Sequence, residues 1–233
     1  MPTIGESHIV KSYDDELKKL QDALSRMGGL AERQMSDALD ALDRRDDDLA
    51  SHTMHGDHLI DEGEHYVNEQ TIRLLALRAP LADDLRKVIT SLKAAGELER
   101  IGDLAANIAK RALALNQNQP VTPMRSLLRM GKLVQELLAE ALYAFINGDA
   151  DRAISVRNRD QEVDDLYSSL FREILTYMME DPRTITTCSH LMFIAKNLER
   201  IGDHATNISE MTYFLVTGQT LHNERPKRDT SIQ

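Results

Sequence analysis

The sequence predicts an all-α protein made of two tandem, pseudo-symmetric three-helix bundles with six long helices. The 233 residues include only 11 Gly and 6 Pro, and strong helix formers such as Ala, Leu, Glu and Arg are frequent. Apolar residues recur at steps of three and four, which places them on one helical face. The segment "LERIGDLAANIA" at 98–109 recurs as "LERIGDHATNIS" at 198–209, so the chain repeats its plan.

Three helices are expected in the first half of the chain. The first follows the acidic opening "YDDE", with Ser12 as its N-cap, and it ends at the charged run of residues 43–48. The second is expected to run unbroken over about 51–78. Because proline lacks an amide hydrogen but is tolerated in a first helical turn, Pro80 marks the boundary before the third helix, at about 81–115.

The second half repeats this plan after a linker at 116–123. The linker is polar, contains two prolines and shows no helical periodicity. Thr122 suits the N-cap of the helix that follows, with Pro123 at its first position. The remaining helices are expected at about 123–147, at about 151–180 and, opened by Asp181 and Pro182, from there to about Val216.

These boundaries divide the chain into a first bundle, the linker, a second bundle and a charged tail that is predicted to be disordered. The four parts cover residues 10–115, 116–123, 124–218 and 219–233. Other features recur at nearly the same offset, since "RMG" occurs at 26–28 and at 129–131. Long helices joined by short connections favour antiparallel bundles of one common plan.

Acidic and amide side chains follow the repeat on two helices of each half. A step of four residues places side chains in one row along a helix. The third helix of each half carries a Glu, an Asp and an Asn at this step, and the second helix carries two Asp. The rows consist of Asp57, Asp61, Glu99, Asp103 and Asn107 in the first half, and Asp160, Asp164, Glu199, Asp203 and Asn207 in the second.

These rows are unfavourable unless something neutralises them. Like charges one turn apart cost a helix roughly 0.2–0.5 kcal/mol, and facing rows or burial raise that cost. A bound divalent or trivalent cation would turn this electrostatic cost into a favourable interaction, and oxygen ligands suit magnesium, calcium, manganese or iron. Two alternatives stay open: Arg100 and Arg200 could neutralise the rows, or the rows could simply be solvated.

A glycine inside each repeated motif carries a second signal. Gly102 and Gly202 occupy the same place in the two segments. Glycine within a helix costs about 1 kcal/mol relative to alanine, so a repeated one needs a reason. We expect a close helix crossing there, and close approach by a ligand is the alternative.

Composition excludes several classes of function. The formal charge is −10 without a basic stripe, which disfavours binding to nucleic acid. The single cysteine, Cys188, excludes an internal disulfide framework and fits a reducing cytoplasm. No segment approaches the roughly 18 consecutive apolar residues of a membrane span, so direct membrane insertion is not expected.

No catalytic motif is evident, and we do not expect an enzyme. Glu62 and His65 resemble the Glu-x-x-His of ferritin-like di-iron proteins, but the second half has Asp165 and Ser168 at the matching places. A metal-dependent, di-iron-like helical-bundle enzyme or storage protein therefore remains the alternative to a non-catalytic role.

The repeated segments resemble the PhoU family, bacterial accessory regulators of phosphate uptake, over about residues 10–218. The resemblance rests on "LKAAGELERIGDLAANIAKR", "IAKNLERIGDHATNISE", "DHLIDEGE" and "DQEVDDLY". It implies two similar bundles in which the eight Asp and Glu residues of the rows bind metal ions, with Asn107 and Asn207 extending them. The implied cofactors are divalent or trivalent ions, namely iron, manganese, magnesium or zinc.

The resemblance also implies a biological role. Members couple the phosphate ABC transporter, through its ATPase subunit, to the sensor histidine kinase of the phosphate two-component system. They act without catalysis as negative regulators of the phosphate regulon and of phosphate uptake. A cytoplasmic homodimer is implied as well. This sequence departs from strict repetition, because Glu62 and Asp165 differ in length and the spacing after Pro80 exceeds that after Pro182 by two residues.

Overall fold

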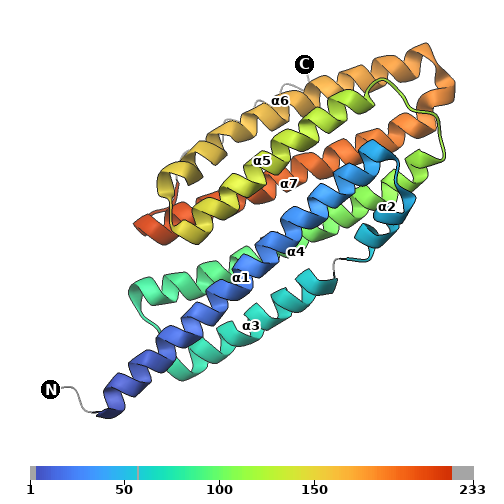
Figure 1. The fold of residues 1–233 in the computed structure, drawn as a ribbon. Coiled ribbons are helices and arrows are strands. Elements are labelled where there is room, and N and C mark those ends of the chain that lie inside the picture. Colours follow the sequence, from blue (N-terminus) through green and yellow to red (C-terminus); the bar gives the residue numbers. More distant parts are fainter. Residues whose placement is uncertain (1–3, 57, 222–233) are drawn as a thin grey trace.

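The computed structural model describes residues 4–56 and 58–221, with side chains from Tyr13 onward (Figure 1). The described part consists of α-helices and one 3-10 turn, η1, and contains no strand. The elements are α1 (Ile4–Arg44), α2 (Asp47–Met54), α3 (His58–Arg78), α4 (Ala82–Asn116), α5 (Met124–Asn147), α6 (Ala150–Glu180), η1 (Pro182–Thr184) and α7 (Ile185–Thr217).

The helices form two three-helix bundles that lie side by side. Bundle one consists of α1, α3 and α4, with the short α2 against α1 and α4, and bundle two consists of α5, α6 and α7. The bundles meet where α4 packs along α7 and α1 packs against α5. Figure 1 shows α4 and α7 between the outer helices α3 and α6. The predicted all-α fold of tandem bundles is therefore confirmed.

The expected second helix is wrong in one respect, because it is divided in two. The helix that was expected over 51–78 is α2, which already begins at Asp47, followed by α3. The amides of His55 and Gly56 bond to the carbonyls of His52 and Thr53, which tightens and ends α2. Glycine just past a helix end is a common stop signal. The six long helices are thus joined by one short one.

Two predicted caps are also wrong. Helix α1 begins at Ile4, so Ser12 lies inside it. At the start of α5, Thr122 accepts a bond from the Arg125 amide with its backbone carbonyl, and no side chain caps this end. Backbone bonding satisfies the helix end without the Thr122 hydroxyl. The predicted disordered tail lies outside the described residues from position 222 onward.

The other helix boundaries follow from local chemistry. Asp149 caps α6 by accepting a bond from the Arg152 amide at 3.0 Å. Helices α5 and α7 end at glycines in the left-handed region, with φ of 63° at Gly148 and 71° at Gly218. None of the described helices combines the length and the hydropathy that crossing a bilayer requires.

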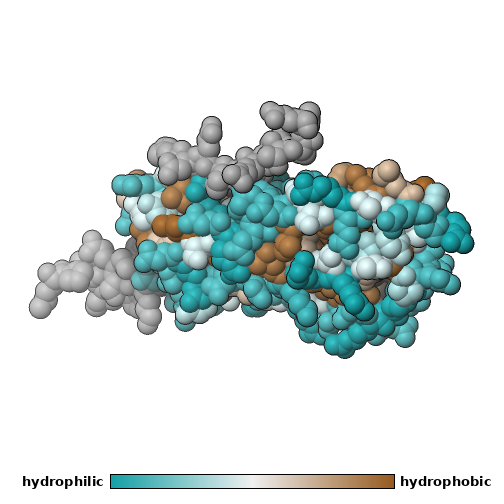
Figure 2. Space-filling view, turned by 90° about the horizontal axis from the view of Figure 1, so that it is seen from above, coloured by the Kyte–Doolittle hydropathy of each residue, from teal (hydrophilic) through white to brown (hydrophobic). Residues whose placement is uncertain are grey.

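The predicted apolar stripes form the core. All of the stripe residues on α4 and α7 are at most 2% exposed: Leu98, Ile101, Ala105 and Ile108, then Leu198, Ile201, Ala205 and Ile208. Burying one such Leu or Ile stabilises the fold by about 1.5–3 kcal/mol. Figure 2 shows that hydrophilic residues cover most of one outer face, with smaller hydrophobic areas between them. The acidic rows therefore flank a well-packed core.

The repeated glycines allow the close crossings that were expected. A Cβ atom on Gly102 would lie 2.8 Å from Ile60 Cδ1 of α3, closer than real side chains allow. On Gly202 it would lie 3.4 Å from Val163 Cγ1 of α6, an ordinary contact distance. The same crossing therefore occurs in both bundles, and it is tighter in bundle one.

Candidate metal centre

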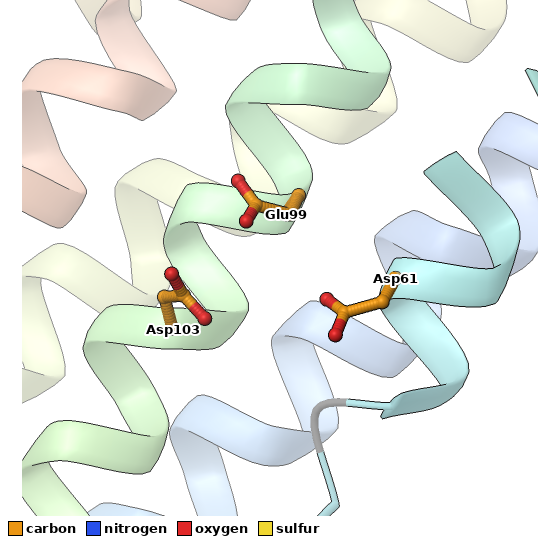
Figure 3. A group of neighbouring side chains, drawn as sticks. All are labelled: Asp61, Glu99 and Asp103. Atoms are coloured by element: carbon orange, nitrogen blue, oxygen red, sulfur yellow. The ribbon is translucent and has the colours of Figure 1, made fainter. Parts of the chain in front are cut away.

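Three carboxylates from α3 and α4 converge beside the crossing in bundle one. Asp61 comes from the first turn of α3, and Glu99 and Asp103 lie one turn apart on α4. One carboxylate oxygen of each lies within 4.8 Å of the others. Figure 3 shows Asp61 reaching from α3 toward the two side chains of α4. Asp61 and Glu99 are half-buried, and Asp103 is exposed.

The glycine crossing explains why these side chains meet. Ile60 contacts Gly102, and the next residue on each helix is an aspartate, Asp61 and Asp103. A residue larger than glycine would have to displace the end of the Ile60 side chain at this level. Glu99 lies one turn before Asp103 and therefore faces the same side. The crossing thus brings the acidic residues of α3 and α4 to the same level of the bundle.

The electrostatics of the cluster are unfavourable in the absence of a cation. Burial raises the pKa of the Glu99 carboxyl above its usual value, and so do the nearby charges of Asp103, Glu64 and Asp61, while Arg100 partly opposes the shift. Among the described residues, no ion pair involves Asp61 or Glu99. A positive ion at this position would relieve the repulsion.

Glu64 lies close enough to this cluster to act on the Glu99 carboxyl, and comparison of the two repeats did not identify it. It lies three residues after Asp61 on α3, a spacing that places two side chains on one helical face. Its side chain is 28% exposed. The spacing alone could have identified it, but the matching residue in the second half is Tyr167, so the repeat gave no sign of it.

The bundle-one residues fit the cation that their pattern implies. Oxygen ligands of one ion at metal–oxygen distances of 2.0–2.6 Å lie at most about 4–5 Å apart, which matches the spacing of this set. Carboxylate oxygens are hard ligands of magnesium, manganese and iron. Asp57, the fourth predicted ligand of this half, lies outside the described residues.

Asn107 and the arginines have other contacts. Asn107 is exposed, and its side-chain amide donates a hydrogen bond to the backbone carbonyl of Asp103 at 2.9 Å. Arg100 lies 3.8 Å from Glu97, and 62% of its side chain is exposed. Arg200 is exposed as well. Asn107 thus lies next to the cluster along α4, whereas Arg100 lies beside Glu97, which is not part of the cluster.

The matching acidic residues of bundle two lie along the α6–α7 edge. Asp160 is 7% exposed and lies 3.6 Å from a Cβ position on Gly202, while Asp164, Glu199 and Asp203 are half-buried. Within the described part of the chain, only the bundle-one set brings three ligand atoms within 4.8 Å. Here Glu199 forms an ion pair with Lys196 instead, at 2.6 Å.

Asn207 lies at the contact between the bundles. It donates a hydrogen bond to Glu97 Oε2 of α4 at 2.9 Å. The same oxygen lies 2.7 Å from His204 Nδ1, and both Glu97 and His204 are buried. Burial alone would raise the pKa of Glu97, but the hydrogen bonds from His204 and Asn207 outweigh it and lower the pKa.

Comparing the two repeats did not reveal this contact, because neither Glu97 nor His204 is repeated in the other half. The residues that match Glu97 and His204 are Asn197 and Leu104. A signal was nevertheless present, because Glu97 lies four residues before the buried Ile101 and so falls on the apolar face of its helix. A carboxylate on a core-facing position needs a buried partner.

Comparison with known proteins agrees with the fold and the motifs. The PhoU domain model matches residues 24–112 and 127–212. The chain is 51% identical over 227 residues to the phosphate-specific transport system accessory protein PhoU homolog of Caulobacter vibrioides strain NA1000, covering 97% of this chain and 99% of that protein.

Two crystal structures are similar over most of the chain. PhoU from Pseudomonas aeruginosa has a TM-score of 0.87 at 41% identity, covering 89% of this chain and 100% of that one. The phosphate transport system regulatory protein PhoU from Streptococcus pneumoniae has a TM-score of 0.83 at 36% identity, covering 90% and 99%. With both halves matched by the family model and relatives similar along nearly their whole length, the chain belongs to the PhoU family.

Proposed function

We propose that the protein is a non-catalytic regulator of phosphate homeostasis. One observation carries the proposal: the chain matches 99% of a relative that is named as a phosphate-specific transport system accessory protein, at 51% identity. The regulatory title of the Streptococcus pneumoniae structure supports the same role. When phosphate is plentiful, the protein restrains phosphate uptake and keeps the phosphate regulon repressed.

The partners we propose are the sensor histidine kinase of the phosphate two-component system and the ATPase subunit of the phosphate ABC transporter. Both act at the cytoplasmic side of the membrane, so the cytoplasm is the proposed location. We further propose a homodimer, which sedimentation of the purified full chain can test. An apparent mass equal to one 26.3 kDa chain would contradict this assembly.

Metal binding at bundle one is the second part of the proposal. Asp61, Glu99 and Asp103 hold a divalent or trivalent cation, with Glu64 close enough to add to the negative potential. The cation neutralises a cluster that otherwise destabilises the α3–α4 edge. It thereby links the position of α3 to the concentration of the ion.

The geometry around Glu62 and His65 does not support the hypothesis of a di-iron enzyme. Glu62 and His65 are both exposed on α3, with 83% of the His65 side chain accessible. The His65 Nδ1 atom is directed to the carbonyl of Asp61 at 2.9 Å, back along its own helix. We therefore propose a regulatory role rather than catalysis or iron storage.

A deletion strain tests the regulatory role. With phosphate in excess, deletion is expected to switch on phosphate-starvation genes, and the intact gene is expected to restore repression. Normal repression in the deletion strain would contradict the role. Co-purification of the kinase and the transporter ATPase with the tagged protein tests the partners.

Site variants in the same strain test the metal role. The double variant Glu99→Gln with Asp103→Asn is expected to lower the bound metal of the purified protein. Glu69→Gln removes an exposed carboxylate from α3 and serves as the matched control. Equal metal content in the double variant and the control would contradict the proposed centre.

A further inference from the structure

The two acidic sites can be compared position by position because the same crossing holds them. Ile60 packs on Gly102 in bundle one, and Val163 packs on Gly202 in bundle two. Ile60 and Val163 are matching residues of the two repeats, as are the two glycines. The side chains next to these contacts therefore occupy equivalent places, and a difference between them is a difference between the sites.

Two such positions carry different charges in the two bundles. The position of Gly96 in bundle one is occupied by Lys196 in bundle two, and the position of Glu64 by Tyr167. Both changes lie on the helices that carry the acidic rows. Together they remove one negative charge and add one positive charge at the second site. The second site is therefore much less negative than the first.

The lysine is held within the second site. Its ammonium nitrogen lies 2.6 Å from Glu199 Oε2 and 5.4 Å from the centre of the Tyr167 ring. The Glu199 side chain is 13% exposed, whereas half of the Lys196 side chain remains accessible to solvent. An ammonium group close to a carboxylate and over an aromatic ring is attracted electrostatically to both.

We propose that Lys196 is a tethered cation that takes the place of a metal ion in bundle two, so that the chain binds metal at bundle one alone. The inference rests on the proposed metal role of Asp61, Glu99 and Asp103. An ion entering the second site would have to displace the ammonium from Glu199 or share its carboxylate with a positive charge. In bundle one the matching position is Gly96, which carries no charge.

The first experiment compares the loss of ligands in the two bundles, using Mn²⁺ as the ion and the purified full chain. Bound Mn²⁺ is measured by elemental analysis and titration calorimetry, and folding by circular dichroism. Glu99→Gln with Asp103→Asn is expected to abolish binding, whereas Glu199→Gln with Asp203→Asn leaves it unchanged. An equal loss from the second pair overturns the inference but keeps metal binding. No loss from the first pair refutes the metal role, and the inference with it.

The second experiment exchanges the residues that distinguish the sites. Lys196→Ala, alone and with Tyr167→Glu, is expected to raise bound Mn²⁺ about twofold, because a second oxygen-lined site becomes available. Lys110→Ala removes another exposed helix lysine and should leave binding unchanged. Bound Mn²⁺ no higher in either Lys196 variant than in this control would overturn the inference.

The reverse exchange places the lysine in bundle one. A side chain added at Gly96 meets no atom within 4 Å of its Cβ, so Gly96→Lys fits without steric conflict. Lysine is also a better helix former than glycine. We expect Mn²⁺ affinity to fall roughly tenfold or more, in the range of changes next to metal ligands, with the thermal midpoint of the metal-free protein maintained or raised. Unchanged affinity would contradict the tethered-cation mechanism.

Discussion

The same substitution at the two repeated glycines is expected to have opposite effects on stability. An alanine at either position gains about 1 kcal/mol of helix propensity over glycine. At Gly202 the new Cβ lies 3.4 Å from Val163 Cγ1 and 3.6 Å from Asp160 Oδ1, which are ordinary contacts. Gly202→Ala should therefore stabilise the protein by up to about 1 kcal/mol.

At Gly102 the new methyl group conflicts with a packed neighbour. Its Cβ would lie 2.8 Å from Ile60 Cδ1 and 3.3 Å from Gln34 Oε1, and both Ile60 and Gln34 are buried. Overpacking of this kind costs about 1–3 kcal/mol, which exceeds the gain in helix propensity. We expect a net loss of up to about 2 kcal/mol for Gly102→Ala.

Thermal unfolding followed by circular dichroism measures the difference between the two variants. For a chain of this length, 1 kcal/mol shifts the midpoint by about 2–4 °C, so Gly102→Ala should melt several degrees below Gly202→Ala. The Gly102 variant should also bind Mn²⁺ more weakly, since displacing Ile60 disturbs the packing next to Asp61. A Gly102→Ala protein as stable as the Gly202→Ala protein would refute the tight-crossing argument.

Three further outcomes are expected. Glu97→Ala leaves His204 buried without its acceptor, so chemical denaturation should show a loss of about 1–3 kcal/mol, and Leu in place of both residues should recover part of it. Burial and acidic neighbours raise the pKa of Glu99, so protons compete with Mn²⁺ for its carboxylate as the pH falls. Mn²⁺ should therefore stabilise the protein less at lower pH. A rise in melting midpoint on adding Mn²⁺ that does not depend on pH would contradict this expectation. The hydrogen bond from Arg78 lowers the pKa of Glu16. The stabilisation that this bond provides should therefore be complete above the ordinary carboxyl pKa of 4.5 and be lost as the pH falls below that value. The difference in unfolding free energy between wild type and Glu16→Gln should accordingly shrink in acid.

Helix content and core could be predicted because local signals and burial agree along the chain. The stripe through Leu98 and Ile101 shows the core face in sequence, and it is buried in the structure. Pro80 and Gly148 mark helix ends through backbone restrictions that depend little on the rest of the fold. The break near Gly56 was missed because the surrounding residues are compatible with a continuous helix.

The candidate site was only partly predictable, because repetition identifies shared residues and hides differences. Asp61, Glu99 and Asp103 were found through their matching spacing in both halves. Lys196 was not, since it lies outside the most similar segment and its contact with Glu199 depends on the side-chain conformation. The pairing of Glu97 with His204 depends on how the two bundles dock, which the spacing within each repeat does not specify.

The most direct measurement is anomalous diffraction from crystals of the full chain soaked in Mn²⁺. We expect a strong anomalous peak among the carboxylates of Asp61, Glu99 and Asp103, and no peak beside Glu199, where the Lys196 ammonium remains in place. A map without a peak at the bundle-one carboxylates, or with its peak at Glu199 instead, would contradict the central claim.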